Sequence, residues 1–320
     1  MSGMRPTGQL HLGHLVGALQ QWVDYCLNAD AYFEIADLHA LTTGYMHPHE
    51  IREARNEMVI DWIAAGVDPD RSTFFLQSAV PEIAELSALL AMITPVSWLQ
   101  RVPTYKDQIA ALGSEIATFG FLGYPLLQLC DIAVFRGERV PVGRDQVAHL
   151  EVGREIVRRF NHLYGNTLIE PQATLSKYSE IPGIDGRKMS KSYGNDIKLA
   201  DDEPTTTRKV RSMITDPKKI RRHDPGNPEI CPVFALWKVA NPAHVAAVDE
   251  GCRSGALGCV QDKGDLADAL NAYLAPIRAR RTELQSDIAR VERIIGEGSA
   301  KARSVAQQTL HDVKRAMKLL

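Results

Sequence analysis

Apolar and polar positions alternate along the first half of the chain in two different rhythms. Residues 31–39, AYFEIADLH, form an aromatic and β-branched run that ends in polar side chains, which is typical of a buried strand. Residues 72–80, STFFLQSAV, repeat this pattern after the turn-rich GVDPD. Between them, residues 50–65 place apolar side chains among charges with the period of an amphipathic helix. Strand, helix and strand at this spacing predict a doubly wound α/β fold, a parallel sheet with helices on both faces.

Polar side chains follow the predicted strands at the edge where such sheets bind ligands. In parallel α/β sheets the ligand lies beyond the carboxyl ends of the strands. We expect four residues near that edge: His11, Asp37, His39 and Gln77. Each of them alone is an ordinary loop residue, and their shared placement is what indicates a site.

The second half of the chain has a different character from about residue 196. Residues 208–229, RKVRSMITDPKKIRRHDPGNPE, are basic and end in a Pro/Gly-rich turn, and helical periodicity dominates from there on. Asp265 has the position of an N-cap for a helix whose apolar face begins at Leu266. The pattern therefore predicts an α/β domain over residues 1–195 and a smaller helical domain over residues 196–320.

Composition narrows the class of protein. The chain has 320 residues, 45% hydrophobic and 24% charged, which is typical of a globular protein with a real core. No window holds the ~20 uninterrupted apolar residues of a membrane span, and the first residues lack the layout of a secretory signal, so we expect a cytoplasmic protein. The formal net charge is −2, so any nucleic-acid partner needs a local basic surface. Five cysteines, an odd number, do not indicate a secreted disulfide framework.

The segment TGQLHLGHLVG, residues 7–17, places His11 three residues before His14. A zinc site could use both imidazoles, but residues 1–23 contain no Cys, Asp or Glu as a further ligand. Three glycines punctuate this junction between a short strand and a helix, where free N–H groups and the helix dipole favour an anion. Imidazole N–H groups could donate to the same anion. A purely structural pair of histidines is the alternative.

A second segment, DGRKMSKSYGN over residues 185–195, carries Lys188 and Lys191 in a loop bounded by glycines. Alone, such a charge run is usually a solvated surface. Together, HLGH (residues 11–14) and KMSKS (residues 188–192) resemble the two motifs of the class I aminoacyl-tRNA synthetases. The second motif matches letter for letter, whereas the first has Leu12 where Ile is common.

Further blocks resemble the tryptophan-specific branch of this class, in the family's order and over essentially the whole chain. They read SGMRPTGQLHLGH, DLHALTT, LQRVPTYKDQ, YPLLQLCDI, VPVGRDQVAHLE and EIVRRFN. The tyrosine-specific branch is the nearest alternative, because it shares the spacing of Tyr124, Gln128 and Asp131. A synthetase-like binding or regulatory protein and a nucleotidyltransferase of the same superfamily are further alternatives, although a binder does not need both motifs.

The resemblance implies a two-step reaction: L-tryptophan and ATP give tryptophanyl-adenylate and pyrophosphate, and tryptophan is then transferred to tRNA(Trp). It implies a Rossmann-like catalytic domain over residues 1–195, with both motifs and a dimer-interface insertion, and an anticodon-binding domain over residues 196–320. It also implies a homodimer, and Mg²⁺ bound with ATP. Only Met1 precedes SGMRPTG, where relatives have several strand residues, so the first strand is either very short or begins outside this sequence.

The resemblance also assigns residues. The catalytic set is His11, His14, Lys188 and Lys191. The ATP-binding set is Arg5, Pro6, Thr7, Gly13, His14, Gly143, Arg144, Asp145, Ile181, Lys188, Met189, Ser190, Lys191 and Ser192. The tryptophan-binding set is Asp131, as acceptor of the indole N–H, with Tyr124, Gln128, Gln146 and His39. The spacing of Tyr124, Gln128 and Asp131, four and then three residues, places them on one face of a helix.

Three cysteines in the second half fall at the positions of a cluster site. Some members of the family hold a [4Fe–4S] cluster on four cysteines, and Cys231, Cys252 and Cys259 match three of them. The fourth position is Asp262, and such a cluster normally needs four thiolates. A decayed site is the favoured interpretation, and a cluster with one carboxylate ligand is the alternative.

Overall fold

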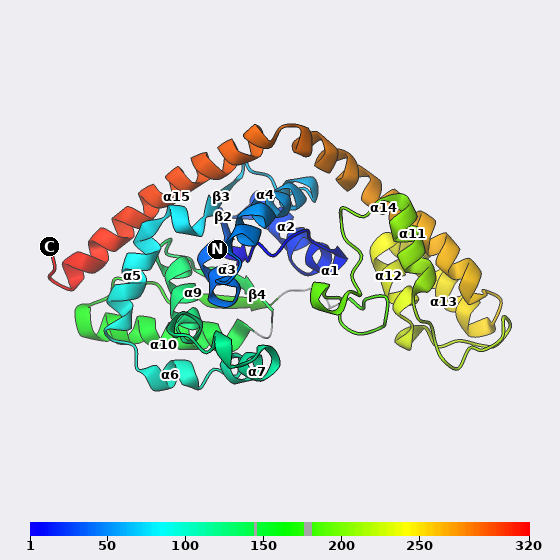
Figure 1. Cartoon of the computed structure of the whole chain (residues 1–320), viewed down its shortest axis with the longest axis horizontal. Coiled ribbons are helices and arrows are strands. Elements are labelled where there is room, and N and C mark those ends of the chain that lie inside the picture. The colour runs from blue at the N-terminus through cyan, green and yellow to red at the C-terminus, as the bar shows by residue number, and fades with distance from the viewer. Residues whose placement is uncertain (144–145, 176–180) are drawn as a thin grey trace.

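The N-terminal half of the chain is built around three short parallel strands (Figure 1). The computed structural model describes residues 1–143, 146–175 and 181–320. The sheet order is β1 (Ser2–Met4), β2 (Ala31–Ile35) and β3 (Ser72–Leu76), so that Gly3 lies opposite Glu34 and Glu34 opposite Phe75. A second, two-stranded parallel pair joins β4 (Arg139–Val142) to β5 (Gln172–Leu175).

Helices and short helical turns connect and cover these strands. Before β4 they are α1 (Leu12–His14), the π-helical turn Leu15–Leu19, α2 (Gln20–Asn28), α3 (Asp37–Gly44), α4 (Pro48–Ala64), the 3-10 turn Gln77–Ala79, α5 (Pro81–Ala91), α6 (Val96–Gln100), α7 (Pro103–Leu112), the 3-10 turn Ser114–Ile116, α8 (Phe119–Leu122) and α9 (Tyr124–Ala133). After β4 they are α10 (Val147–Tyr164), the 3-10 turn Lys191–Tyr193, α11 (Glu203–Ser212), the 3-10 turn Pro228–Ile230, α12 (Pro232–Ala240), the 3-10 turn Pro242–His244, α13 (Val245–Ser254), α14 (Cys259–Ser286) and α15 (Ile288–Ala316). Within the described residues, none of these helices has the length and apolar character needed to cross a bilayer.

Alternation of side chains along the strands creates two cores, one on each face of the sheet. Phe33 and Phe74 belong to the core that α2 and α4 supply, where Trp22 stacks on Phe33 with ring centroids 4.3 Å apart. Tyr32 and Phe75 belong to the other core, which α5, α9 and α10 cover. The predicted α/β class with a parallel sheet between helices is confirmed.

Two predicted boundaries are wrong. The strand expected over residues 31–39 ends at Ile35, and α3 begins at Asp37, so His39 lies on a helix rather than at a strand end. Asp265 is not an N-cap, because α14 already begins at Cys259, six residues earlier, after an extended Gly258. Glycine, not the acidic residue, marks the start of this helix.

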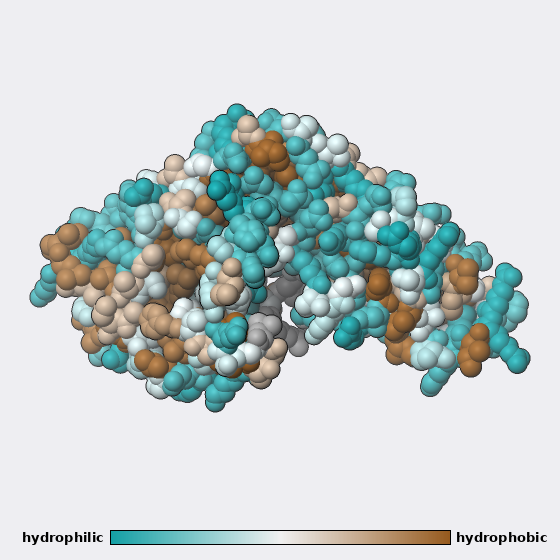
Figure 2. Space-filling model, viewed as in Figure 1, coloured by the Kyte–Doolittle hydropathy of each residue, from teal (hydrophilic) through white to brown (hydrophobic). Residues whose placement is uncertain are grey.

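The last two helices form a ridge across both halves of the molecule (Figure 1). Helix α14 packs against α11 and α12 at one end and against α4 at the other, and α15 then lies along β3 and α5. Gly298 makes this close approach possible, because a Cβ there would lie 1.9 Å from the carbonyl oxygen of Phe74. Figure 2 shows mostly hydrophilic residues along the ridge and hydrophobic ones gathered around the position of α5 and α9.

A buried cluster of charges joins this ridge to the N-terminal segment. Arg281 of α14 forms ion pairs with Asp61 and Glu57 of α4, and Arg281 and Asp61 are 2% and 0% exposed. The backbone N–H of Leu10 donates to the Asp61 carboxylate at 2.6 Å, and the Gln9 amide donates to Glu57 at 3.3 Å. The residues just before His11 are therefore held by a helix of the catalytic half and, through it, by α14.

We expect replacement of Arg281 by methionine to reduce the free energy of unfolding by about 3–5 kcal/mol at neutral pH, because Asp61 is then a buried charge without its cation. Burial already raises the pKa of Asp61 to about 6. Arg281 acts to lower this pKa, so the pKa is higher still in the variant, and the loss should shrink as the pH falls toward 6, because the carboxyl group of the folded variant then accepts a proton. Urea denaturation of Arg281→Met, with the exposed neighbour Arg280→Met as control, measures both effects. Equal losses in the two variants would contradict this account.

Candidate active site

The two sequence motifs lie side by side. The segment around His11 pairs with the residues that follow the lysine loop, residues 185–195. The N–H of Leu12 donates to the carbonyl oxygen of Ile197 at 3.0 Å, and the N–H of Leu199 donates to the carbonyl oxygen of Leu10 at 2.9 Å. His11 and Lys198 form the antiparallel bridge between them. Backbone hydrogen bonds thus connect segments that are almost two hundred positions apart in the sequence.

Hydrogen bonds fix the orientation of the two histidine rings. The Nδ1 atom of His11 accepts from the N–H of Gly13 at 3.1 Å, and the Nδ1 atom of His14 accepts from the N–H of His11 at 3.3 Å. A Cβ at position 13 would lie 2.8 Å from the His11 ring, so glycine permits this arrangement. Since both Nδ1 atoms accept, the ring proton of each neutral histidine is on Nε2. The pair can offer two N–H donors.

Burial keeps both rings neutral. It lowers the pKa of His11 to about 4, with Asp196 acting in the opposite direction and Lys191 adding to the effect. It lowers the pKa of His14 to about 2, assisted by His11 and Lys191. At neutral pH the histidines are therefore hydrogen-bond donors without charge. Zinc ligation is not indicated, because among the described residues no group of three or more His, Cys, Asp or Glu side chains could hold a metal ion.

Lys191 reaches from the lysine loop to the N-terminal segment. Its ammonium group donates to the carbonyl and hydroxyl oxygens of Thr7, both at 3.2 Å, and to the carbonyl oxygen of Gly8 at 3.1 Å. Burial lowers the pKa of Lys191, while Asp61 and Asp196 act in the opposite direction. The structure thus brings a lysine of the second motif beside the loop that precedes His11 and His14.

Asn195, which is 1% exposed, holds the lysine loop closed. Its amide oxygen accepts from the N–H of Ser190 at 2.8 Å, and its amide nitrogen donates to Asp185 at 2.7 Å and to the carbonyl of Lys188 at 3.1 Å. Gly183 makes room for it, because a Cβ there would lie 2.4 Å from the Asn195 side chain. The loop conformation is therefore set by a neutral amide rather than by its lysines.

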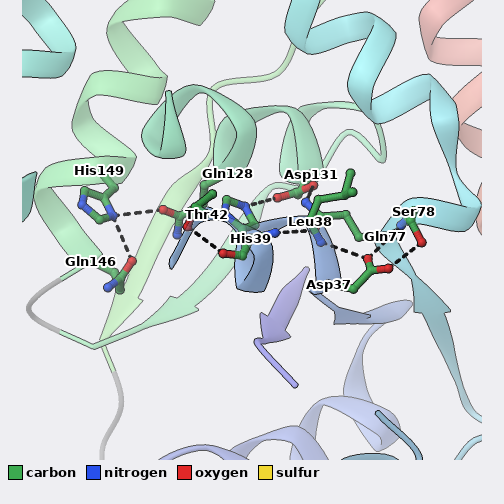
Figure 3. Close-up of polar contacts among 10 residues, drawn as sticks. All are labelled: Asp37, Leu38, His39, Thr42, Gln77, Ser78, Gln128, Asp131, Gln146 and His149. Atoms are coloured by element: carbon green, nitrogen blue, oxygen red, sulfur yellow. Dashed lines mark hydrogen bonds and ion pairs between the residues drawn. The ribbon is translucent and has the colours of Figure 1, made fainter. Parts of the chain in front are cut away.

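A separate cavity of about 370 Å³ lies between β1, α3 and α9, and all five predicted tryptophan-binding residues line it. Asp131 of α9 is 2% exposed. One of its carboxylate oxygens lies 2.8 Å from Nε2 of His39, and the other accepts from the Gln77 amide at 2.8 Å. Figure 3 shows these side chains converging from α3, α9 and the end of β3. Gln77 is oriented in turn, because its oxygen accepts from the backbone N–H of His39 at 3.2 Å.

The other end of the cavity carries amides. Tyr124 and Gln128 share the face of α9 that Asp131 occupies, as predicted, and the Tyr124 ring lies 4.1 Å from that of His39. Nδ1 of His149 lies 3.2 Å from the amide oxygen of Gln128 and 3.0 Å from that of Gln146 (Figure 3). The cavity therefore has a carboxylate at one end and uncharged polar groups at the other.

The predicted ATP-binding residues divide between these two places. Arg5 and Gly143 line the cavity, whereas none of residues 188–192 belongs to its described lining. Pro6, Ile181 and Met189 are buried near the loop, and Lys188 and Ser192 are exposed. Ser190 and Ser192 contact each other through their hydroxyls at 2.8 Å. Arg144 and Asp145 lie outside the described residues.

The cysteine positions do not fit a four-thiolate cluster. Asp262 at the fourth position accepts from the Trp237 indole N–H at 2.7 Å, so that carboxylate oxygen already has a partner. Burial raises the pKa of the Cys231 and Cys252 thiols. We assign no chemistry to these residues.

Sequence reasoning missed four residues of the site, and each is defined by its surroundings. Asp61 and Asn195 act through backbone groups of the two motifs, His149 lies between two predicted glutamines, and Glu34 lies on a strand beneath the cavity. The one signal in the sequence is Asn195, which closes the glycine-bounded loop. The others carry no pattern that separates them from ordinary helix and strand residues.

The geometry described so far, a parallel sheet with an HLGH turn closed against a KMSKS loop, defines an aminoacyl-tRNA synthetase of class I. The family model "tRNA synthetases class I (W and Y)" matches residues 1–275, and the chain belongs to this family.

Full-length relatives specify the branch. Tryptophan–tRNA ligases from Aquifex aeolicus and Thermotoga maritima are 42% and 46% identical to this chain. Both matches cover 100% of this chain and 99% of the relative. The crystal structure of tryptophanyl-tRNA synthetase from Campylobacter jejuni, complexed with ADP and tryptophan, is 31% identical with a TM-score of 0.90. That similarity covers 99% of this chain and 98% of the other.

We expect the rings of His11 and His14 to remain neutral across the physiological range. Histidine-selective NMR should show no titration of their resonances between about pH 5.5 and 8, where an ordinary histidine passes through its midpoint. Titration of either ring with a midpoint near 6.5 would contradict the effect of burial on these pKa values.

We expect Asn195→Ala to loosen the lysine loop without unfolding the chain, because three hydrogen bonds that hold it are lost. Limited trypsin digestion should cut after Arg187, Lys188 or Lys191 about tenfold faster than in the unmodified protein. Asn28→Ala, at an exposed asparagine bonded only within its own helix, should leave the rate unchanged. Equal rates for the two variants would remove this role from Asn195.

Proposed function

We propose that the chain joins L-tryptophan to tRNA(Trp) in two steps, with ATP as the energy source. The observation that carries the proposal is the contact of Lys191 with Thr7 and Gly8, which closes the two motifs beside a cavity holding a buried Asp131. Full-length relatives named for this activity support the same conclusion.

In the first step, a carboxylate oxygen of tryptophan attacks the α-phosphorus of ATP. A new P–O bond forms, the bond to the β-phosphate breaks, and pyrophosphate leaves with the electron pair. Both reacting groups, a carboxylate and a phosphate, carry negative charge, so positioning and charge neutralisation supply most of the rate. We assign charge neutralisation on the leaving group to Lys188 and Lys191, and hydrogen bonds to the phosphates to Nε2 of His11 and His14.

We assign the remaining nucleotide contacts to the loop and strand ends around the cavity. Gly13 gives phosphate close access to the backbone, and Arg5, Pro6 and Thr7 precede it. Gly143, Arg144 and Asp145 would hold the ribose, and Ile181 and Met189 would border the adenine side. Mg²⁺ would enter bound to the phosphates of ATP, since magnesium usually keeps waters and substrate oxygens as ligands.

Tryptophan selection rests on the cavity. Asp131 would accept the indole N–H, with His39 and Tyr124 beside it and Gln128 and Gln146 toward the amino and carboxylate groups. A ring without an N–H would leave one acceptor direction of the buried carboxylate unfilled, beside those that His39 and Gln77 already occupy, and such a deficit discriminates between substrates.

In the second step, a terminal ribose hydroxyl of the tRNA attacks the carbonyl carbon of the adenylate, and AMP leaves. We propose that residues 1–195 form the catalytic unit and that residues 196–320 contact the anticodon. The basic segment 208–229, which includes the exposed Arg221 and Arg222, would meet tRNA phosphates and make binding dependent on salt.

We further propose a cytoplasmic homodimer. The two subunits would meet through the part of the catalytic half around α5 and α6, where Met92 and Val96 are 79% and 57% exposed. Large exposed apolar side chains grouped on one surface are typical of interfaces.

ATP–pyrophosphate exchange tests the function directly. We expect exchange with tryptophan and none with tyrosine. Lys191→Ala should lower kcat by about 10²–10³-fold, because it removes a positioned group that stabilises developing charge. Lys238→Ala, at an exposed lysine remote from the two motifs, is the matched control and should retain full activity. Exchange with tyrosine alone would assign the other branch of the family, and no exchange with either amino acid would favour a binding or regulatory protein.

A further inference from the structure

Glu34 is a buried acid at the wall of the amino-acid cavity, and neither motif contains it. It is the last residue but one of β2, is 3% exposed, and lines the same cavity as Asp131 and His39. A carboxyl group in such surroundings is unusual, because acidic side chains are rarely buried without a partner. A strand position in the core would ordinarily hold an apolar residue.

A glycine on the neighbouring strand leaves room for the Glu34 side chain. Gly3 of β1 lies opposite it, and a Cβ at Gly3 would come within 3.0 Å of both Cβ and Oε2 of Glu34. Oε1 has no hydrogen-bond partner among the described residues, and the same is true of Nδ1 of His39. Oε1 of Glu34 and Nδ1 of His39 are thus two buried polar atoms at the wall of one cavity without a hydrogen-bond partner among the described residues. This indicates a ligand site rather than simple packing.

Glu34 also contacts Asp131. The two side chains are hydrogen-bonded, and burial, followed by the charge of Asp131, raises the pKa of Glu34 well above its usual range. The titratable groups around it are Asp131 on α9, Asp37 and His39 on α3, and the amino terminus of Met1 at the cavity wall. Adjacent carboxylates do not both ionise readily, which favours the protonated form of Glu34 beside Asp131.

We propose that Glu34 is a positioning residue for substrate recognition: its neutral carboxyl group donates a hydrogen bond to Asp131 and fixes the carboxylate that accepts the ring N–H of the amino acid. This inference rests on the proposed function, because it takes Asp131 as the group that reads the ring. It adds a second acid to the pocket, acting through Asp131 rather than by contact with the reacting atoms.

The count of hydrogen bonds explains why a third donor matters. An ionised carboxylate offers about four lone-pair directions. His39 and Gln77 each occupy one on Asp131, at 2.8 Å, and the Glu34 carboxyl occupies a third. About one direction remains, and the substrate N–H fills it. Without Glu34, the carboxylate has a second open direction and a less defined orientation.

Binding of two ligands by isothermal titration calorimetry tests the proposal. The first is tryptophan, and the second is 3-benzothienylalanine, in which sulfur replaces the ring N–H. We expect Glu34→Ala to weaken tryptophan binding by about tenfold or more, and binding of the analogue by less than about threefold. Glu34→Gln, which keeps a neutral donor at the same place, should restore tryptophan binding to within about threefold of the unmodified protein. Glu297→Ala on the exposed surface of α15 is the control.

Two further measurements use Glu34→Gln alone and do not depend on whether Glu34→Ala folds. The tryptophan affinity of the unmodified protein, divided by that of Glu34→Gln, should fall at alkaline pH, because Glu34 ionises and loses its donor. Titration of the substrate itself affects both proteins equally and cancels in this ratio. Infrared spectra in heavy water should show a protonated-carboxyl stretch that Glu34→Gln lacks.

The outcomes separate this proposal from the proposed function. Loss of tryptophan binding in Glu34→Gln as severe as in Glu34→Ala, a ratio independent of pH, or absence of the infrared band would overturn the role of Glu34. If Glu34→Ala weakened the binding of tryptophan and of 3-benzothienylalanine equally, Glu34 would only pack against the cavity and would have no role in reading the ring N–H. Failure of the unmodified protein to bind tryptophan would instead overturn the proposed function.

Discussion

The buried carboxylate of Asp61 is the interaction on which the site depends most. It accepts the backbone N–H of Leu10, directly before the first motif, and the guanidinium of Arg281 from α14. One group thereby connects the first motif, the α4 helix behind the sheet and the ridge that extends into the helical half. A buried carboxylate without such partners would be strongly destabilising, so the three elements are coupled.

Burial determines the charge state of the site's other titratable groups, with opposite results for acids and bases. It lowers the pKa values of His11 and His14, so these rings are neutral donors near neutral pH. It raises the pKa of Glu34, which favours the neutral form of this acid beneath the cavity. Charge is concentrated instead on Lys191 and its surroundings, where an anionic substrate can use it. The same desolvation therefore separates donors that orient from a cation that neutralises.

The sequence predicted the elements whose periodicity is local. The β2 and β3 strands, the α4 helix between them and the shared face of Tyr124, Gln128 and Asp131 all follow from the spacing of side chains within one segment. Boundaries were less secure, because a cap depends on the conformation of one or two residues. Thus residues 37–39, which the pattern assigned to the strand, belong to α3 instead. Helix α14 begins at Cys259, six residues before Asp265, the N-cap that the pattern favoured.

The sequence alone determined the class of fold and the two motifs, because those features are contained in short stretches, and it predicted which residues carry the chemistry. Only the tertiary structure decided which atoms meet: Lys191 with Thr7, Arg281 with Asp61, and Glu34 with Asp131. These partners lie far apart in the chain, and no local pattern encodes their distance. The sequence likewise could not predict the pKa shifts of the buried side chains, because these depend on how much water the folded chain excludes from each group.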